Sequence, residues 1–288
     1  MKIKLLAVLS ILVLAFAACS RPIPVSQAPS KAAADATLLL AQNLEQKQRW
    51  QDSEQTFASA LKQYRTFGDL RGEQYALSGL ARLAHIAQDD AGFTMYRQQL
   101  AELIRLADPE GAHVLLLLDL FVLQDVGDYA GIREKAVDSY DYPLHVRIQV
   151  LTHALQAESR LRPEYSGVTF RNLERLSNRY RRGLKKDFSA DPGVLASALY
   201  AMAYHTYLLR DYKSALKYIS EAADFDTRYE NFPALGYDLW LKATINEADD
   251  RPDQARSDYI RAANIFRHFE NTQMLAKTEA ALMRLIGD

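Results

Sequence analysis

Cysteine is almost absent from this sequence, and the one present lies close to the N-terminus. A single cysteine, Cys19, rules out an intramolecular disulfide and a cysteine-rich metal site. Glycine and proline are also scarce, at 12 and 9 of 288 residues, whereas 49% of the residues are hydrophobic and 25% are charged. This composition is typical of a globular protein with a substantial core and excludes a disordered chain.

Neither sign of charge dominates the chain. It carries 35 lysines and arginines against 36 aspartates and glutamates, which gives a net charge of −1. Because no overall positive field is available to concentrate a polyanion, the sequence disfavours nucleic acid as a partner.

The motifs of common enzyme classes are missing as well. The sequence contains no Gly-x-Ser-x-Gly elbow, no phosphate-binding glycine loop and no dinucleotide fingerprint. Among six histidines, the nearest approach to a helical zinc motif is His145 and His153, eight residues apart. That spacing is about 12 Å of helical rise, too far for two imidazoles to share one metal. We therefore expect no enzymatic activity, no cofactor and no metal.

The first eighteen residues have the layout of a secretory signal peptide. Two lysines precede an apolar run over residues 5–16, which is too short to span a bilayer, and the small pair Ala17-Ala18 follows it. The string Phe16-Ala17-Ala18-Cys19 resembles the bacterial lipobox. Two alternatives are an ordinary secretory peptide cleaved near Ala18, with Cys19 left as a free thiol, and an uncleaved anchor helix.

The lipobox resemblance implies that residues 1–18 are removed and that Cys19, acylated on its thiol with palmitate among its chains, becomes the new N-terminus. Several acyl chains would hold the protein durably in a membrane. By the sorting pattern of such lipoproteins, Ser20 implies an outer-membrane location in the cell envelope, facing the periplasm. Residues 19–34 predict an extended tether, because three prolines interrupt helical hydrogen bonding there: Pro22, Pro24 and Pro29.

Residues 35–288 predict an all-α domain. Apolar residues recur at helical spacing in one segment after another, with no alternating strand pattern and no hairpin turn signal. Two segments near the C-terminus repeat each other: a small residue lies twelve positions before a second one, which is followed by a large apolar residue at +4 and a small one at +7. These sets are Ala203, Ala215, Ile219 and Ala222, and Ala243, Ala255, Tyr259 and Ala262.

This pattern resembles the tetratricopeptide repeat, in which small residues let two antiparallel helices approach closely. The same register fits Ala41, Ser53, Phe57 and Ala60, and more loosely Gly79, Ala91 and Met95. In the middle we place one unit on Tyr129, Ile132, Ala136 and Ser139, and another on Leu161, Leu173, Ser177 and Tyr180.

The second helix of each unit is anchored at Ser53, Ala91, Ile132, Leu173, Ala215 and Ala255, with spacings of 38, 41, 41, 42 and 40 residues against 34 in the standard repeat. The resemblance implies a right-handed superhelix of about six helical hairpins, closed by a capping helix near residues 272–286.

A basic ridge is the first candidate binding surface. Its five cations are Arg171, Arg175, Arg179, Arg182 and Lys186. On a helix they occupy an arc of about 80°, opposite an apolar face, so they must face outward. They form either an ordinary solvated face or a docking surface for an anionic partner: an acidic protein face, lipid headgroups or a cell-wall polymer.

Aromatic residues on the first helices of the C-terminal hairpins form the second candidate surface. They are Tyr200, Tyr204, Tyr207, Tyr237 and Trp240. Rings with polar tips are favoured at binding surfaces, and here they would line a concave groove. Alternatively, most of them fill the core between hairpins, with Tyr204 and Tyr207 the most exposed.

By analogy of fold, these features predict a membrane-anchored scaffold that binds envelope proteins in an assembly, secretion or cell-wall machine. One alternative is a periplasmic protein that binds a ligand or glycan, or that assists a cell-wall enzyme. Another is a pilotin-like factor that escorts an outer-membrane component to its site.

Overall fold

The computed structural model describes residues 28–137, 140–184 and 191–287. In these ranges the protein is all-α, without a strand, as predicted. The helices are α2 (Pro29–Gln46), α3 (Trp50–Phe67), α4 (Leu70–Ile86), α5 (Asp90–Ala107), α6 (Ala112–Asp125), α7 (Tyr129–Lys135), α8 (Leu144–Leu161), α9 (Gly167–Leu184), α10 (Pro192–Leu208), α11 (Tyr212–Arg228), α12 (Phe232–Ala248), α13 (Pro252–His268) and α14 (Thr272–Gly287). Short 3₁₀ turns, η1 (Pro109–Gly111) and η2 (Pro163–Tyr165), precede α6 and α9.

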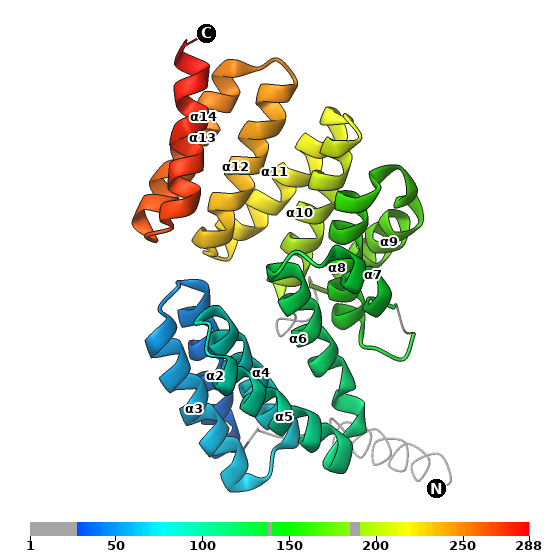
Figure 1. Ribbon diagram of the computed structural model, residues 1–288, viewed down its shortest axis with the longest axis vertical. Helices are drawn as coiled ribbons and strands as arrows, with labels where there is room; N and C mark the ends of the chain where they lie inside the picture. Colours follow the sequence, from blue (N-terminus) through cyan, green and yellow to red (C-terminus); the bar gives the residue numbers. More distant parts are fainter. Residues whose placement is uncertain (1–27, 138–139, 185–190, 288) are drawn as a thin grey trace, which may run out of the picture.

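Consecutive helices pack against each other along the whole described chain. Six antiparallel hairpins, from α2–α3 to α12–α13, build a repeat superhelix, and α14 packs on α13 at its end. We call the first helix of each hairpin helix A and the second helix B. Figure 1 shows that the stack curves, so that the N-terminal hairpins and the C-terminal hairpins lie on opposite sides of a concave face, joined through α6 to α9. The predicted hairpin repeat and the capping helix are confirmed.

The turns between helices share one local geometry. Before five helices, α4, α5, α7, α10 and α11, an aspartate caps the helix by accepting a hydrogen bond from a backbone N–H. The five aspartates are Asp69, Asp89, Asp128, Asp191 and Asp211. The preceding residue often takes a left-handed conformation, as Gly68, Gln88, Gly127 and Arg210 do. This pairing ends one helix and starts the next within a few residues.

Small residues bring the helices of each hairpin together. In the first hairpin Ala41, Ser53, Phe57 and Ala60 are all fully buried, and Ser53 Oγ donates to the Ala41 carbonyl over 2.8 Å. The corresponding sets in the last two hairpins are buried too. Gly79 of α4 lies against the Phe57 ring so closely that a Cβ atom there would overlap it. The predicted register is therefore confirmed in the first, fifth and sixth hairpins.

The register of the second hairpin was wrong. Ala91 and Met95 are exposed, because the Asp89 cap makes α5 begin at Asp90. The anchor is the fourth residue of helix B in the other hairpins, and the fourth residues of α5 and α9 are Phe93 and Phe170, which are partly buried, whereas the predicted Leu173 of α9 is fully buried. The anchors then repeat after 40, 39, 38, 45 and 40 residues.

Other boundaries also differ from the prediction. Leu161 is exposed at the end of α8, although Leu173, Ser177 and Tyr180 are buried as expected. Helix α7 ends at Lys135, so Ala136 is its C-cap and not an interior residue, while Ser139 lies outside the described ranges.

The tether was expected to reach residue 34, but α2 begins at Pro29 and buries Ala34 completely. A proline at the first helical position is compatible with a helix, because its missing N–H would have no helical partner there.

Candidate functional site

A continuous groove follows the concave face of the superhelix. Two cavities of about 390 Å³ and 510 Å³ adjoin there. They share the lining residues Gln149, Asp191, Val194 and Ser197. The helices A of all six hairpins contribute to the lining, from Gln42 and Gln46 of α2 to Tyr237 and Asp238 of α12. The curvature of the stack therefore brings its first and last hairpins to one site.

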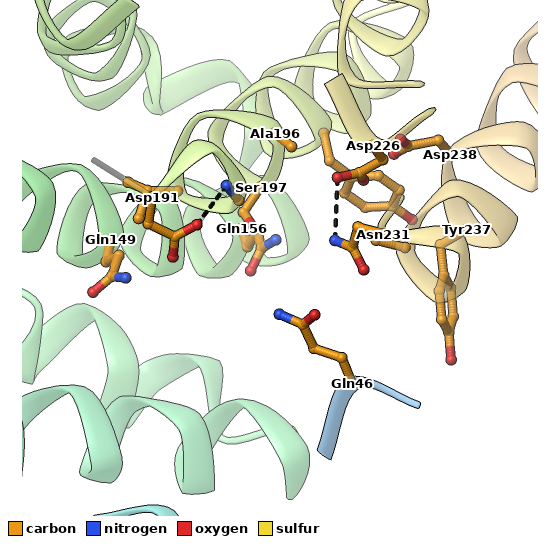
Figure 2. A pocket seen from close by; sticks show the side chains of 14 residues that line it. Gln46, Gln149, Gln156, Asp191, Ala196, Ser197, Asp226, Asn231, Tyr237 and Asp238 are labelled. Atoms are coloured by element: carbon orange, nitrogen blue, oxygen red, sulfur yellow. Dashed lines mark hydrogen bonds between the residues drawn. The ribbon is translucent and has the colours of Figure 1, made fainter. Parts of the chain in front are cut away.

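Five side-chain amides lie among the polar groups that line the groove. They belong to Gln42, Gln46, Gln149, Gln156 and Asn231. Figure 2 shows Gln46 extending from the end of α2 into the space that Gln156 and Asn231 approach from the other side. Each amide offers both hydrogen-bond donors and an acceptor, so this lining can pair with a ligand that presents both kinds of group.

Two carboxyl groups meet at the C-terminal end of the groove. Asp226 of α11 and Asp238 of α12 are 4% and 2% exposed, and they form a hydrogen bond with each other. Asp226 also accepts from Asn231 Nδ2 over 3.1 Å. Burial raises the pKa of both carboxyl groups, that of Asp238 most strongly. A carboxylate cannot donate, so the pair shares one proton at neutral pH.

The central part of the groove is lined by histidines that are neutral at pH 7. His113 Nδ1 lies 2.9 Å from the Glu110 carbonyl, and His153 Nδ1 lies 2.5 Å from Gln124 Oε1. Burial lowers the pKa of His113, of His145 and, to about 4, of His153. In the described ranges, no group of three or more histidine, cysteine or acidic side chains is arranged to hold a metal ion.

The aromatic surface predicted from the sequence divides into two parts. Tyr200 and Tyr237 line the groove. Tyr204 and Tyr207 lie further along α10, half-buried, and the Arg160 guanidinium sits 4.9 Å from the Tyr204 ring centre. Trp240 packs against the core between hairpins. Two of these rings therefore line the groove, and Trp240 belongs to the core between hairpins.

The basic ridge faces outward on α9, as predicted. Its arginines Arg171, Arg175, Arg179 and Arg182 are exposed, whereas Leu173, Leu176 and Tyr180 on the opposite face are buried. Within the described part of the chain none of the four forms an ion pair, in contrast to the neighbouring Arg181, which contacts Glu221 at 2.6 Å. Helix α9 is a helix B, so the ridge lies outside the groove. The ridge residue Lys186 and Cys19, the predicted lipidation site, lie outside the described residues.

The carboxyl pair and the amide lining were not found from the sequence. A signal existed: with the 40-residue repeat of this region, Asp238 falls at the position of buried Ala198, and Asp226 at that of buried Phe266. Two acidic residues at positions that are apolar in the adjacent hairpin indicate a local departure from core packing. Repeat alignment alone could not show that the two carboxyl groups meet.

Comparison with models of known protein families gives no match, and comparison with curated proteins gives none either. None of the described helices combines the length and the apolar character needed to cross a membrane.

Proposed function

We propose that this protein is a lipid-anchored scaffold of the bacterial envelope that binds extended segments of partner proteins in its concave groove. The observation that carries the proposal is the continuous, amide-lined groove that crosses all six helices A. An extended polypeptide presents N–H and C=O groups along its length, and glutamine and asparagine side chains can pair with both. The resemblance to tetratricopeptide repeats supports the same role by analogy.

The envelope location rests on the first nineteen residues. A signal peptide that ends directly before the single cysteine supports export and acylation at Cys19. We expect the Cys19→Ala variant to lose [³H]palmitate labelling and to leave the outer-membrane fraction. Membrane association that is unchanged in this variant would refute the anchor.

Site-specific photo-crosslinking in cells tests the groove. A photoreactive amino acid replaces Gln149 in the groove or, as a matched control, Gln254 on the exposed face of helix α13. We expect defined protein adducts from position 149 and none of these from position 254. Equal adducts at both positions, or none at either, would argue against a groove that binds proteins.

Glycan is the alternative ligand, because its hydroxyl groups also pair with amides. Cosedimentation with purified cell-wall sacculi distinguishes the two. Saturable binding that is lost when Gln149 and Gln156 are changed to alanine, without protein adducts at position 149, would favour the glycan-binding role.

The exposed arginines of α9 support a second contact, with an anionic membrane surface. Four aligned cations without carboxylate partners in the described chain would attract anionic headgroups, each by about 1 kcal/mol. Flotation of the protein, with residues 1–19 removed, on phosphatidylglycerol vesicles tests this. Arg175→Glu/Arg179→Glu should abolish binding, whereas Lys62→Glu/Lys277→Glu, with the same change in net charge, should not. If both variants lose vesicle binding equally, the ridge is an ordinary solvated face and not a membrane-binding surface.

A further inference from the structure

The C-terminal end of the groove is electronegative. Three carboxyl groups line this cavity of about 390 Å³, those of Asp191, Asp226 and Asp238, and none of the described lining residues is a lysine, an arginine or a histidine. Asp191 acts on Asp226 through its charge. In a chain of net charge −1, this is a local concentration of one sign.

Asp238 gives an independent indication of a missing ligand group. Its side chain is almost completely buried, and its Oδ2 atom has no N–H donor in the described chain, so the Asp226 carboxyl group is the hydrogen-bond partner of this side chain. Buried polar atoms in proteins are nearly always hydrogen-bonded, and one shared proton with the Asn231 amide leaves this carboxyl pair short of donors.

The fold does not require acids at these positions. The same positions in neighbouring repeats hold Ala198 and Phe266, which are buried and pack normally. A buried carboxyl pair destabilises the folded state because desolvation disfavours ionisation. Side chains that cost stability and line a cavity are candidates for function.

Two aromatic rings complete the surroundings of the carboxyl groups. Tyr200 and Tyr237 line the same cavity, and Figure 2 shows Tyr237 on the side opposite Asp191. A cation is attracted both by carboxylates and by the faces of aromatic rings. The chemistry of the cavity therefore matches a cationic donor group.

We propose that a lysine or arginine side chain of the bound polypeptide enters this cavity and donates to Asp226 and Asp238. This inference rests on the proposed function, because it assigns a basic side chain to the polypeptide that the groove is proposed to bind. A polypeptide is preferred over a free amine because the cavity continues into the 510 Å³ part of the groove, whose lining extends to α4 and α6, beyond the reach of a small cation.

Selection of peptides tests this inference. A phage-displayed library of random dodecapeptides is selected against the wild type, against Asp226→Asn/Asp238→Asn and against Asp224→Asn. The last variant is the matched control, because Asp224 is an exposed carboxylate of the same helix that does not line the cavity. We expect a lysine or arginine to be enriched at one position with the wild type and with Asp224→Asn, and not with the double variant.

Affinities of one selected peptide then measure the contact. Replacing its basic residue by norleucine should weaken binding to the wild type about tenfold or more and leave binding to the double variant nearly unchanged. Circular dichroism checks the fold of each protein. If the double variant does not fold, Asp191→Asn takes its place, since asparagine also caps α10, and it should reduce the effect of the basic residue several-fold.

The outcomes separate this inference from the proposed function. Selected peptides without a basic preference, or an equal norleucine effect in both proteins, would overturn the inference and leave a groove that binds polypeptides. No selected peptide with any protein would overturn both. Saturable binding of spermidine in calorimetry, without peptide binding, would assign the cavity to a small polyamine instead.

Discussion

Replacing Asp238 by asparagine should make the protein more stable, and by an amount that grows with pH. Burial raises the pKa of Asp238 to about 9, whereas an aspartate in the unfolded chain has a pKa of about 3.9. Between these values the folded protein holds a proton that the unfolded chain releases. The free energy of unfolding therefore falls as pH rises, by up to about 1.4 kcal/mol per pH unit.

Asparagine removes this cost, because its amide donates to Asp226 without taking up a proton. The stabilisation by Asp238→Asn should be close to zero near pH 4 and should grow to several kcal/mol, on the order of 4, by pH 7. Asp226, whose pKa burial raises to about 6, contributes in the same direction over a narrower range.

Urea unfolding followed by circular dichroism at pH 5, 6, 7 and 8 measures the effect. The slope of the free energy of unfolding against urea concentration should be the same in the variant and the wild type. Asp224→Asn, at an exposed position on the same helix as Asp226, is the control and should have no effect beyond about 0.5 kcal/mol. A variant that is less stable than the wild type at pH 8, or a difference that does not change with pH, would refute the shared proton.

Three further predictions concern stability, each measured by urea unfolding. Gly79→Ala should destabilise the protein by about 1–3 kcal/mol, because the new Cβ would overlap the Phe57 ring. Asp211→Ala should cost about 1 kcal/mol, because α11 loses the cap on the Ser214 N–H, and Asp211→Asn should restore most of it. Burial lowers the pKa of His153 to about 4, so the unfolded chain binds a proton first as pH falls below 6.5, and this histidine should contribute a loss of about 3 kcal/mol by pH 4, against the gain from the carboxyl pair. Relative to the wild type, His153→Gln should therefore become more stable between pH 7 and pH 4; a constant difference would contradict the assignment to His153.

The hairpin repeat could be predicted because it depends on local spacing. Small residues such as Ala215 and Ala255 stand where two helices touch, and they keep this role wherever the turn length is constant. The prediction failed around Ala91, because the helix start is set by the Asp89 cap and not by the apolar pattern. It also failed at Pro29. Proline is disfavoured inside helices but is common at their first position, so its presence could not distinguish a tether from a helix start.

The candidate site was less accessible to sequence reasoning. Tyr200 and Tyr237 could be assigned to the groove, because they lie on helices A and carry polar tips. The approach of Gln46 to α8 and α12 depends on the curvature accumulated over several hairpins, and no local pattern encodes it. The carboxyl pair required knowing that α11 and α12 turn these two side chains toward each other.

The participation of Gln46 in a cavity with Tyr237 and Asp238 has a mechanical consequence. A repeat superhelix behaves like a spring, because each hairpin contacts only its neighbours and small changes at each junction add up. A ligand that bridges α2 and α12 would couple the two ends of that spring. Binding should therefore narrow the distribution of end-to-end distances, and force applied between α2 and α14 should release the ligand before any hairpin unfolds.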